Sequence, residues 1–157
     1  MRRSAAVLLL AAAAVLAGCG SDAGTDEDPE PAAEATMLTV ASSAVGDIVA
    51  DGAGMSLYLF TEDSPGTSTC TGDCLEAWPA LEGEPSAGEG IDASLLGTIE
   101  REDGTTQATY ADWPLYYFAQ DTAPGDVTGQ GVNEVWYLLS PAGESITEAV
   151  PADTSGY

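Results

Sequence analysis

Two stretches of this chain are copies of each other, and they decide its fold. The first is GMSLYLFTEDSPG, from Gly54 to Gly66, and the second is DWPLYYFAQDTAPG, from Asp112 to Gly125. At a spacing of 58 residues the matched positions are Leu57 and Leu115, Tyr58 and Tyr116, Phe60 and Phe118, and Asp63 and Asp121. Each copy is a short aromatic and aliphatic run bounded by Gly, Pro and Asp, a pattern typical of a β-strand between turns.

The match continues outward from these two stretches in the same register. Gly46 corresponds to Gly104, Trp78 to Trp136 and Leu81 to Leu139. Two copies are too few for a solenoid, so we expect one domain with two related halves that share a core. The repeats span about residues 45–81 and 103–139.

The alternation within each copy predicts which side chains share a face. In the first copy Leu57 and Leu59 should lie on one face of the strand, and Tyr58 and Phe60 on the other. Both faces are apolar, so we expect residues 57–60 and 115–118 to form central strands that are covered on both sides.

The rest of residues 37–150 also reads as β structure. Further strands are expected at 37–41, 47–50, 95–101, 106–111, 135–140 and 145–149. A hairpin turn is expected at Glu102-Asp103-Gly104, one helical turn at 73–78, and a long central loop at 82–90. The prediction is an all-β fold, one compact and mostly antiparallel domain, followed by a tail at 151–157.

The first 18 residues are typical of a bacterial signal peptide. Arg2 and Arg3 precede an uninterrupted apolar run from Ala5 to Leu16, which is too short to span a membrane. The run ends in Leu16-Ala-Gly-Cys19, which resembles a lipobox. We therefore expect lipidation of Cys19, with acyl chains such as palmitate, and an extracytoplasmic protein anchored to the cell membrane. The alternative is an ordinary secretory signal with a chance cysteine.

An acidic linker follows the lipidated cysteine. Residues 20–36 contain six acidic side chains and two prolines but no bulky apolar residue. Such a segment cannot bury enough surface to fold, so residues 19–36 are predicted to be a disordered tether. Repulsion between its charges should extend it and hold the domain away from the membrane.

The composition excludes several classes of function. The chain has 26 acidic residues, three basic ones and no histidine, and all three basic residues are arginines. After removal of the signal peptide only Arg101 is left, so a nucleic-acid partner is excluded. Histidine bases, histidine metal ligands and Schiff-base lysines are excluded as well.

The repeated motif resembles a known family. Tyr58-Leu-Phe60-Thr-Glu-Asp63 and Tyr116-Tyr-Phe118-Ala-Gln-Asp121 look like the Tyr-x-(aromatic)-x-x-Asp motif of a bacterial lipoprotein family known as the secreted repeat of unknown function. Trp78-Pro79 and Trp113-Pro114 fit the same pattern. Ala80 and Ala111-Asp112 depart from it, because the family often has Pro and Asn-Gly there. The resemblance implies an envelope lipoprotein and brings no activity with it.

Cys70 and Cys74 are the strongest candidates for chemistry. With Cys19 lipidated they form an even pair, and outside the cytoplasm the sequence CTGDC should close a disulfide loop. The alternative is a redox-active dithiol or a copper(I) thiolate site, for which Met55 is the only soft partner nearby in sequence. We expect a structural disulfide and no cofactor.

The repeated aspartates have two readings. Asp63 and Asp121 each precede a Pro-Gly turn, where an Asp side chain commonly accepts backbone N–H bonds in an Asx turn. The functional alternative is a site for calcium or another hard cation, completed by Glu62, Asp73 or Asp126. No loop has EF-hand spacing, so the turn is the preferred reading.

The strand aromatics are expected to be core residues, since aromatic pairs on strands usually pack inside. A partly exposed strip that stacks on sugar rings or grips a partner is the alternative. The residues concerned are Tyr58, Phe60, Trp78, Tyr110, Trp113, Tyr116, Phe118 and Trp136.

These features favour a non-catalytic binding or interaction module of the envelope, whose partner is a protein, a glycan or a cation. The alternative of a different class is a redox or metal-handling lipoprotein that uses Cys70 and Cys74. A small hydrolase with two carboxylates is the third hypothesis, but nothing in the sequence marks such a pair. We therefore name no catalytic residue and do not expect an enzyme.

Overall fold

The computed structural model of the chain describes residues 36–151. The predicted signal peptide, the lipidated Cys19, nearly all of the acidic linker and the tail after residue 151 lie outside this range. Within it, no helix is both long and apolar enough to cross a membrane.

Most of the regular secondary structure of the described residues is in short strands, which confirms the predicted all-β class. Its elements are β1 (Met37–Ser43), β2 (Gly46–Asp51), β3 (Tyr58–Phe60), α2 (Asp73–Ala77), β4 (Ser86–Ala87), η1 (Ala93–Leu95), β5 (Leu96–Glu100), β6 (Thr106–Tyr110), β7 (Trp113–Pro114), η2 (Val132–Glu134) and β8 (Trp136–Leu138). The described strands form three sheets, with the orders β2-β1-β4, β3-β8 and β5-β6-β7. Only the pair β1–β4 is parallel, and all other strand pairs are antiparallel.

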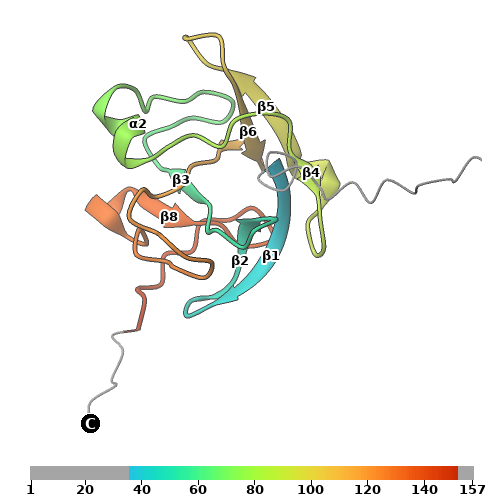
Figure 1. The fold of residues 1–157 in the computed structure, drawn as a ribbon, viewed down its shortest axis with the longest axis vertical. Coiled ribbons are helices and arrows are strands. Elements are labelled where there is room, and N and C mark those ends of the chain that lie inside the picture. Colours follow the sequence, from blue (N-terminus) through green and yellow to red (C-terminus); the bar gives the residue numbers. More distant parts are fainter. Residues whose placement is uncertain (1–35, 152–157) are drawn as a thin grey trace, which may run out of the picture.

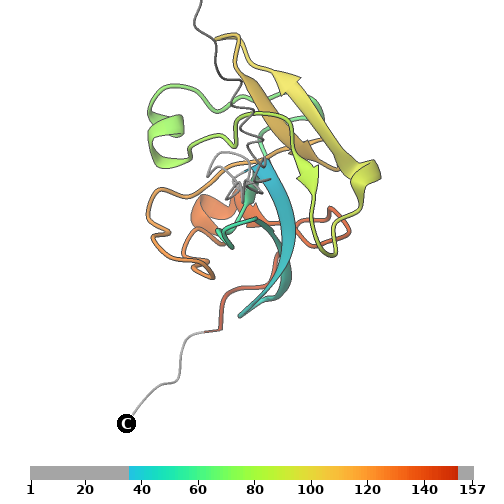
Figure 2. The same cartoon turned by 45° about the vertical axis from the view of Figure 1, so that its right-hand side comes forward.

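A hairpin lies at the start of each repeat, and its first strand precedes the predicted repeat boundary. In the first, β1 pairs with β2 and the turn closes at Gly46; in the second, β5 pairs with β6 and the turn closes at Gly104. These matched glycines have φ values of 107° and 84°, a conformation that is strained for residues with a Cβ. Figures 1 and 2 show the two hairpins on one side of the molecule and α2 on the other, with β3 between them.

The core has two clusters, and the predicted alternation divides the motif between them. Leu57 and Leu59 belong to one cluster together with Leu115, whereas Tyr58 belongs to the other, where Phe60 packs at its edge. Leu57, Tyr58 and Leu59 are each at most 1% exposed. The first motif strand is therefore covered on both faces, as predicted, but it is not the central strand of a sheet: within residues 36–151 it pairs with β8 alone and makes an isolated bridge to Tyr116.

The prediction of a strand at 115–118 is wrong. Tyr116 makes only isolated bridges, to Tyr58 and to Ala80. The segment that lies beside it contains Pro79, which accepts the Tyr117 N–H at 2.8 Å but has no N–H to donate in return. The matching position in the other repeat is Tyr137, and there a regular pair forms between β3 and β8.

Two further predictions need correction. The segment 145–149 is not a strand: Ser145 makes one bridge to Leu139, and Ile146 is the only buried side chain of the five. The central loop 82–90 contains β4, which extends the first hairpin sheet by pairing with Met37 and Leu38.

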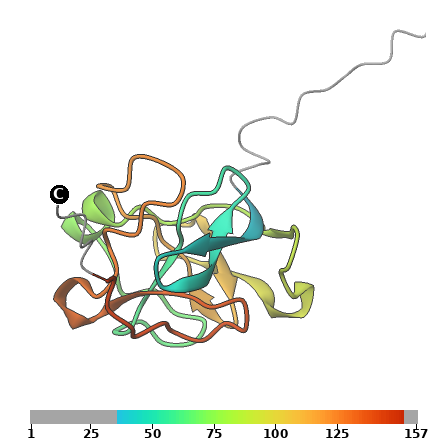
Figure 3. The same ribbon diagram turned by 90° about the horizontal axis from the view of Figure 1, so that it is seen from below.

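Figure 3 shows the molecule from below, again with α2 and the helical turn before β8 on the side away from the hairpins.

Candidate functional site

The two motifs are joined by reciprocal side-chain hydrogen bonds. The Tyr58 hydroxyl donates to Oδ2 of Asp121 at 2.6 Å, and the Tyr116 hydroxyl donates to Oδ2 of Asp63 at 2.6 Å. Each tyrosine therefore pairs with the aspartate of the other repeat. We call these two pairs the cross-repeat clasp. All four residues are buried.

The second oxygen of each aspartate closes a loop of its own repeat. Oδ1 of Asp63 accepts the Thr69 N–H at 2.6 Å and the Thr69 hydroxyl at 2.9 Å. Oδ1 of Asp121 accepts the Thr128 N–H at 3.0 Å and also the Thr128 hydroxyl. The backbone donors lie six and seven residues away, beyond the reach of the predicted Asx turn.

The backbone repeats the same reciprocity. The Tyr58 N–H donates to the Tyr116 carbonyl at 2.8 Å, and the Tyr116 N–H donates to the Tyr58 carbonyl at 3.0 Å. Such self-complementary contacts are those of an isologous interface, in which an approximate two-fold axis relates the two sides. The axis passes between Tyr58 and Tyr116.

The motif aromatics form one stack across this axis. Trp78 and Trp136 are parallel within 4°, with ring centroids 3.9 Å apart. Phe118 stacks on Trp78 at 4.3 Å and Phe60 on Trp136 at 4.2 Å. Tyr58 meets Trp78 edge-on at 5.3 Å, and Tyr116 meets Trp136 at 5.2 Å. Phe60 is half-buried and the other five rings are buried.

The two remaining predicted aromatics lie apart from this stack. Tyr110 is fully buried in the aliphatic cluster, and its hydroxyl donates to the Pro141 carbonyl at 2.7 Å. Trp113, on β7, is half-buried at the edge of the same cluster.

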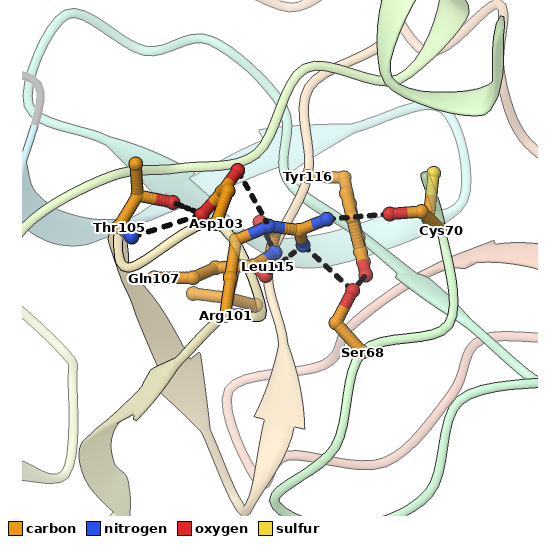
Figure 4. A network of polar contacts seen from close by, with 8 residues as sticks. All are labelled: Ser68, Cys70, Arg101, Asp103, Thr105, Gln107, Leu115 and Tyr116. Carbon is orange, nitrogen blue, oxygen red and sulfur yellow. Dashed lines mark hydrogen bonds and ion pairs between the residues drawn. The ribbon is translucent and has the colours of Figure 1, made fainter. Parts of the chain in front are cut away.

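One buried cation breaks the symmetry of the site. Arg101 is 8% exposed, and its guanidinium donates to the Ser68 hydroxyl at 2.6 Å, to Oε1 of Gln107 at 2.6 Å and to the Cys70 carbonyl. Ser68 in turn shares a hydrogen bond of 2.6 Å with the Tyr116 hydroxyl. Figure 4 shows the guanidinium at the centre of this network, with Asp103 beside its Nε at 4.0 Å.

A small pocket of about 380 Å³ opens beside the network. Its lining combines the turn of the second hairpin with the segment around the two cysteines, through Ser68, Thr71, Gly72, Leu75, Arg101, Glu102 and Asp103. Arg101 was not among the predicted site residues. The sequence distinguishes it only as the single base that follows the signal peptide.

The predicted disulfide is confirmed. Cys70 and Cys74 are bonded, with Cα atoms 5.4 Å apart. Cys70 is buried in the aromatic cluster and Cys74 is partly buried at the start of α2. The Arg101 guanidinium holds the Cys70 carbonyl, so the disulfide loop is tied to the second repeat.

The acids proposed for a cation site are not gathered into one. Within residues 36–151 no group of three or more Cys, Asp and Glu side chains is placed to hold a metal ion. Asp126 serves its own turn, where its Oδ2 accepts the Thr122 and Ala123 N–H groups at 2.8 and 2.9 Å. These bonds lower the pKa of the Asp126 carboxyl. Glu62 and Asp73 are exposed.

Burial and the aspartate partners raise the pKa values of three tyrosines. Burial, followed by the hydrogen bond to Asp63, raises the pKa of Tyr116 to about 12. The pKa of Tyr58 is raised further, by burial and then by Asp121. A third pair behaves in the same way: the Tyr117 hydroxyl donates to Asp51 at 2.9 Å, and burial and this carboxylate raise the Tyr117 pKa.

The Tyr116 shift predicts a loss of stability at high pH. An unfolded tyrosine ionises near pH 10, below the folded value of about 12, so the protonated hydroxyl contributes its full stability below pH 10. We expect that contribution to disappear as the pH rises from 10 to 12. Urea midpoints measured across this range should fall more steeply for the wild type than for Tyr116→Phe. Equal slopes would contradict the assignment.

Comparison with known proteins gives one match. The family model described as a secreted repeat of unknown function matches the chain twice, at residues 39–82 and 97–140, which together make up more than half of its length. No curated protein and no solved structure matches. The two matched segments each contain one hairpin, one motif and one of the stacked tryptophans.

Proposed function

The chain belongs to the family of the secreted repeat of unknown function, and from this premise we propose that it is a lipid-anchored, non-catalytic interaction module of the cell envelope. Its extracytoplasmic location follows from the family. The anchor and the interaction role are the proposal.

The cross-repeat clasp is the observation that carries the non-catalytic role. Asp63 and Asp121 are the acids that the motif repeats, and both of their oxygens already accept hydrogen bonds from residues of the domain. The two tyrosine hydroxyls are bound to these carboxylates, and their raised pKa keeps them protonated. Groups committed in this way stabilise the fold and are not poised to attack or protonate a substrate. The motif then serves as a scaffold, and function lies on the surface that it supports.

The charge of that surface supports a particular range of partners. Arg101 is the only base among residues 36–151 and it is buried, so every exposed ionised side chain of this part of the chain is acidic. A surface of one sign repels polyanions and attracts partners with basic faces. This favours cations and basic envelope proteins as partners, leaves neutral glycans possible on electrostatic grounds, and disfavours nucleic acid.

The anchor is supported by the sequence that precedes the domain. The apolar run of residues 5–16 ends in Leu16-Ala-Gly-Cys19, and an acidic linker separates Cys19 from β1. A thioether-linked lipid at Cys19, together with acylation of its amino group, would supply the two or more chains that stable membrane anchoring needs. The linker would then place the acidic domain away from the bilayer.

Cell fractionation combined with intact-mass measurement tests this proposal. The wild-type protein should partition with membranes, carry lipid at Cys19 and weigh two hydrogens less than its dithiol form. Cys19→Ser should move the protein to the soluble fraction. Cys70→Ser, the matched control, should remain with the membranes because it removes a cysteine that is not the anchor. Wild type and Cys19→Ser in the same fraction would refute the anchor, and a metal or chromophore retained in native mass spectra would refute the simple scaffold.

A further inference from the structure

The aromatic stack connects two tyrosines through two tryptophans. From one end the rings are Tyr58, Trp78, Trp136 and Tyr116, with successive centroid distances of 5.3, 3.9 and 5.2 Å. Rings at these separations are in direct contact. The line crosses the approximate two-fold axis, so it runs from one repeat to the other without a break.

A proton acceptor is already in place at each end of the line. Removing an electron from a phenol makes its O–H strongly acidic, so oxidation becomes easy where a base can take the proton at once. Asp121 accepts the Tyr58 hydroxyl at 2.6 Å, and Asp63 accepts the Tyr116 hydroxyl at the same distance. Both distances are within the range at which a carboxylate can take a proton.

We propose that Tyr58, Trp78, Trp136 and Tyr116 form a one-electron relay, which gives an electron to a one-electron oxidant, such as an oxidising radical, that reaches the domain. The relay goes beyond the proposed interaction role and does not depend on the lipid anchor. It assigns a redox capacity to aromatic residues, not to the Cys70–Cys74 pair.

The reaction moves one electron to the oxidant and one proton to an aspartate. The oxidant gains one electron, taken first from the indole of Trp78 or Trp136. Tyr58 then returns an electron to the indole, while its O–H bond breaks and the proton moves to Oδ2 of Asp121. The products are a neutral tyrosyl radical, a neutral carboxylic acid and the reduced oxidant. A one-electron reductant reverses the step, and the proton returns to the Tyr58 oxygen.

Different neighbours make Tyr58 and Tyr116 unequal as sites of oxidation. Near Tyr116 the Arg101 guanidinium donates to Ser68, and Ser68 bonds the Tyr116 hydroxyl. Loss of an electron changes the net charge of the tyrosine–aspartate pair from −1 to 0, and a nearby cation opposes this loss of negative charge. Tyr58 has the Gly129 N–H at 3.2 Å as its other partner, and the Asp126 carboxylate acts on it electrostatically. The oxidised site should therefore settle at Tyr58.

Tyr110 provides an internal control. It is as completely buried as Tyr58, but its hydroxyl donates to the Pro141 carbonyl, which cannot hold a proton at neutral pH. A buried phenol of this kind should not form a stable radical. Tyr58→Phe and Tyr110→Phe remove the same atom from equally buried rings, so a difference between them reports the carboxylate partner and the ring line.

Electron paramagnetic resonance after one-electron oxidation tests the relay. The folded protein would be oxidised with flash-generated azide radicals or a photo-oxidised ruthenium polypyridyl complex, frozen, and examined for the radical type. We expect a tyrosyl signal that falls at least five-fold in Tyr58→Phe and is unchanged in Tyr110→Phe. Asp121→Asn should lower the tyrosyl signal as Tyr58→Phe does, because Tyr58 then has no carboxylate to take its proton. Asp63→Asn combined with Asp121→Asn should replace the tyrosyl signal with an indole signal, because Tyr116 then lacks its acceptor as well. A tyrosyl yield in Tyr58→Phe equal to that of the wild type, or an equal fall in Tyr110→Phe, would overturn the proposal.

Discussion

Replacing Trp136 with alanine should lower the free energy of unfolding by about 4 kcal/mol, which is typical of the loss of a large aromatic side chain from a packed core. Trp136 is 3% exposed and lies between the rings of Trp78 and Phe60, with Tyr116 perpendicular to it. These neighbours are held by their own contacts and cannot collapse into the space, so the cavity should persist. Urea or guanidinium unfolding of the folded domain measures the effect.

Trp113→Ala is the matched control for this prediction. The same side chain is removed, but Trp113 is half-buried on β7 at the edge of the aliphatic cluster. The expected loss is less than half of that for Trp136, since part of the indole already contacts water. Equal losses at the two positions would show that the stack has no special weight in the fold.

Asp121→Ala should cost about 3 kcal/mol, because it leaves the buried Tyr58 hydroxyl and two donors of one threonine without their acceptor. The donors are the Tyr58 hydroxyl and the N–H and hydroxyl of Thr128. Tyr58→Phe removes one donor and leaves Asp121 with the other two, so we expect a loss of only about 1 kcal/mol. Chemical unfolding curves of both variants provide the measurement.

The matching substitution in the other repeat should be milder. Asp63→Ala also removes the acceptor of a tyrosine and a threonine, but the Tyr116 hydroxyl retains Ser68 as a partner. Glu76→Ala is the surface control. Glu76 is exposed on α2, and a change of less than about 0.5 kcal/mol is expected there. A loss at Asp121 no larger than that at Glu76 would rule out a stabilising clasp.

The all-β class and the two-repeat organisation could be predicted because they depend on local patterns. The alternation in Leu57-Tyr-Leu-Phe60 separates two apolar faces, and the structure places those faces in two clusters. The disulfide could be predicted for a similar reason. Two cysteines four residues apart, with Thr-Gly-Asp between them, are brought together by a turn.

The cross-repeat contacts could not be predicted, because a 58-residue period shows that two segments are alike and not how they meet. Asp63 was predicted to bond its own turn, but its second oxygen receives a tyrosine 53 residues away. The error at 115–118 has the same origin. Its motif is strand-like, yet the strand fails because its distant neighbour contains Pro79, and local sequence does not reveal that neighbour.

The role of Arg101 was missed for an electrostatic reason. Charged side chains are expected at the surface, and nothing beside Arg101 in the chain announces that it is buried. Its acceptors come from separate segments: Ser68 and Cys70 precede it by more than 30 residues, and Gln107 lies on the next strand. Only the fold brings these neutral oxygens together around one guanidinium.

Double-mutant cycles on the four motif residues test the central claim, that hydrogen bonds between the two motifs hold the repeats together. The substitutions are Tyr58→Phe, Tyr116→Phe, Asp63→Asn and Asp121→Asn, singly and in pairs, with the free energy of unfolding as the readout. We expect coupling energies of about 1 kcal/mol or more for Tyr58 with Asp121 and for Tyr116 with Asp63, the two pairs that bond across the repeats. We expect coupling near zero for the pairs within one repeat, Tyr58 with Asp63 and Tyr116 with Asp121. Coupling confined to the pairs within each repeat would contradict the clasp and would show that each motif forms only a local turn.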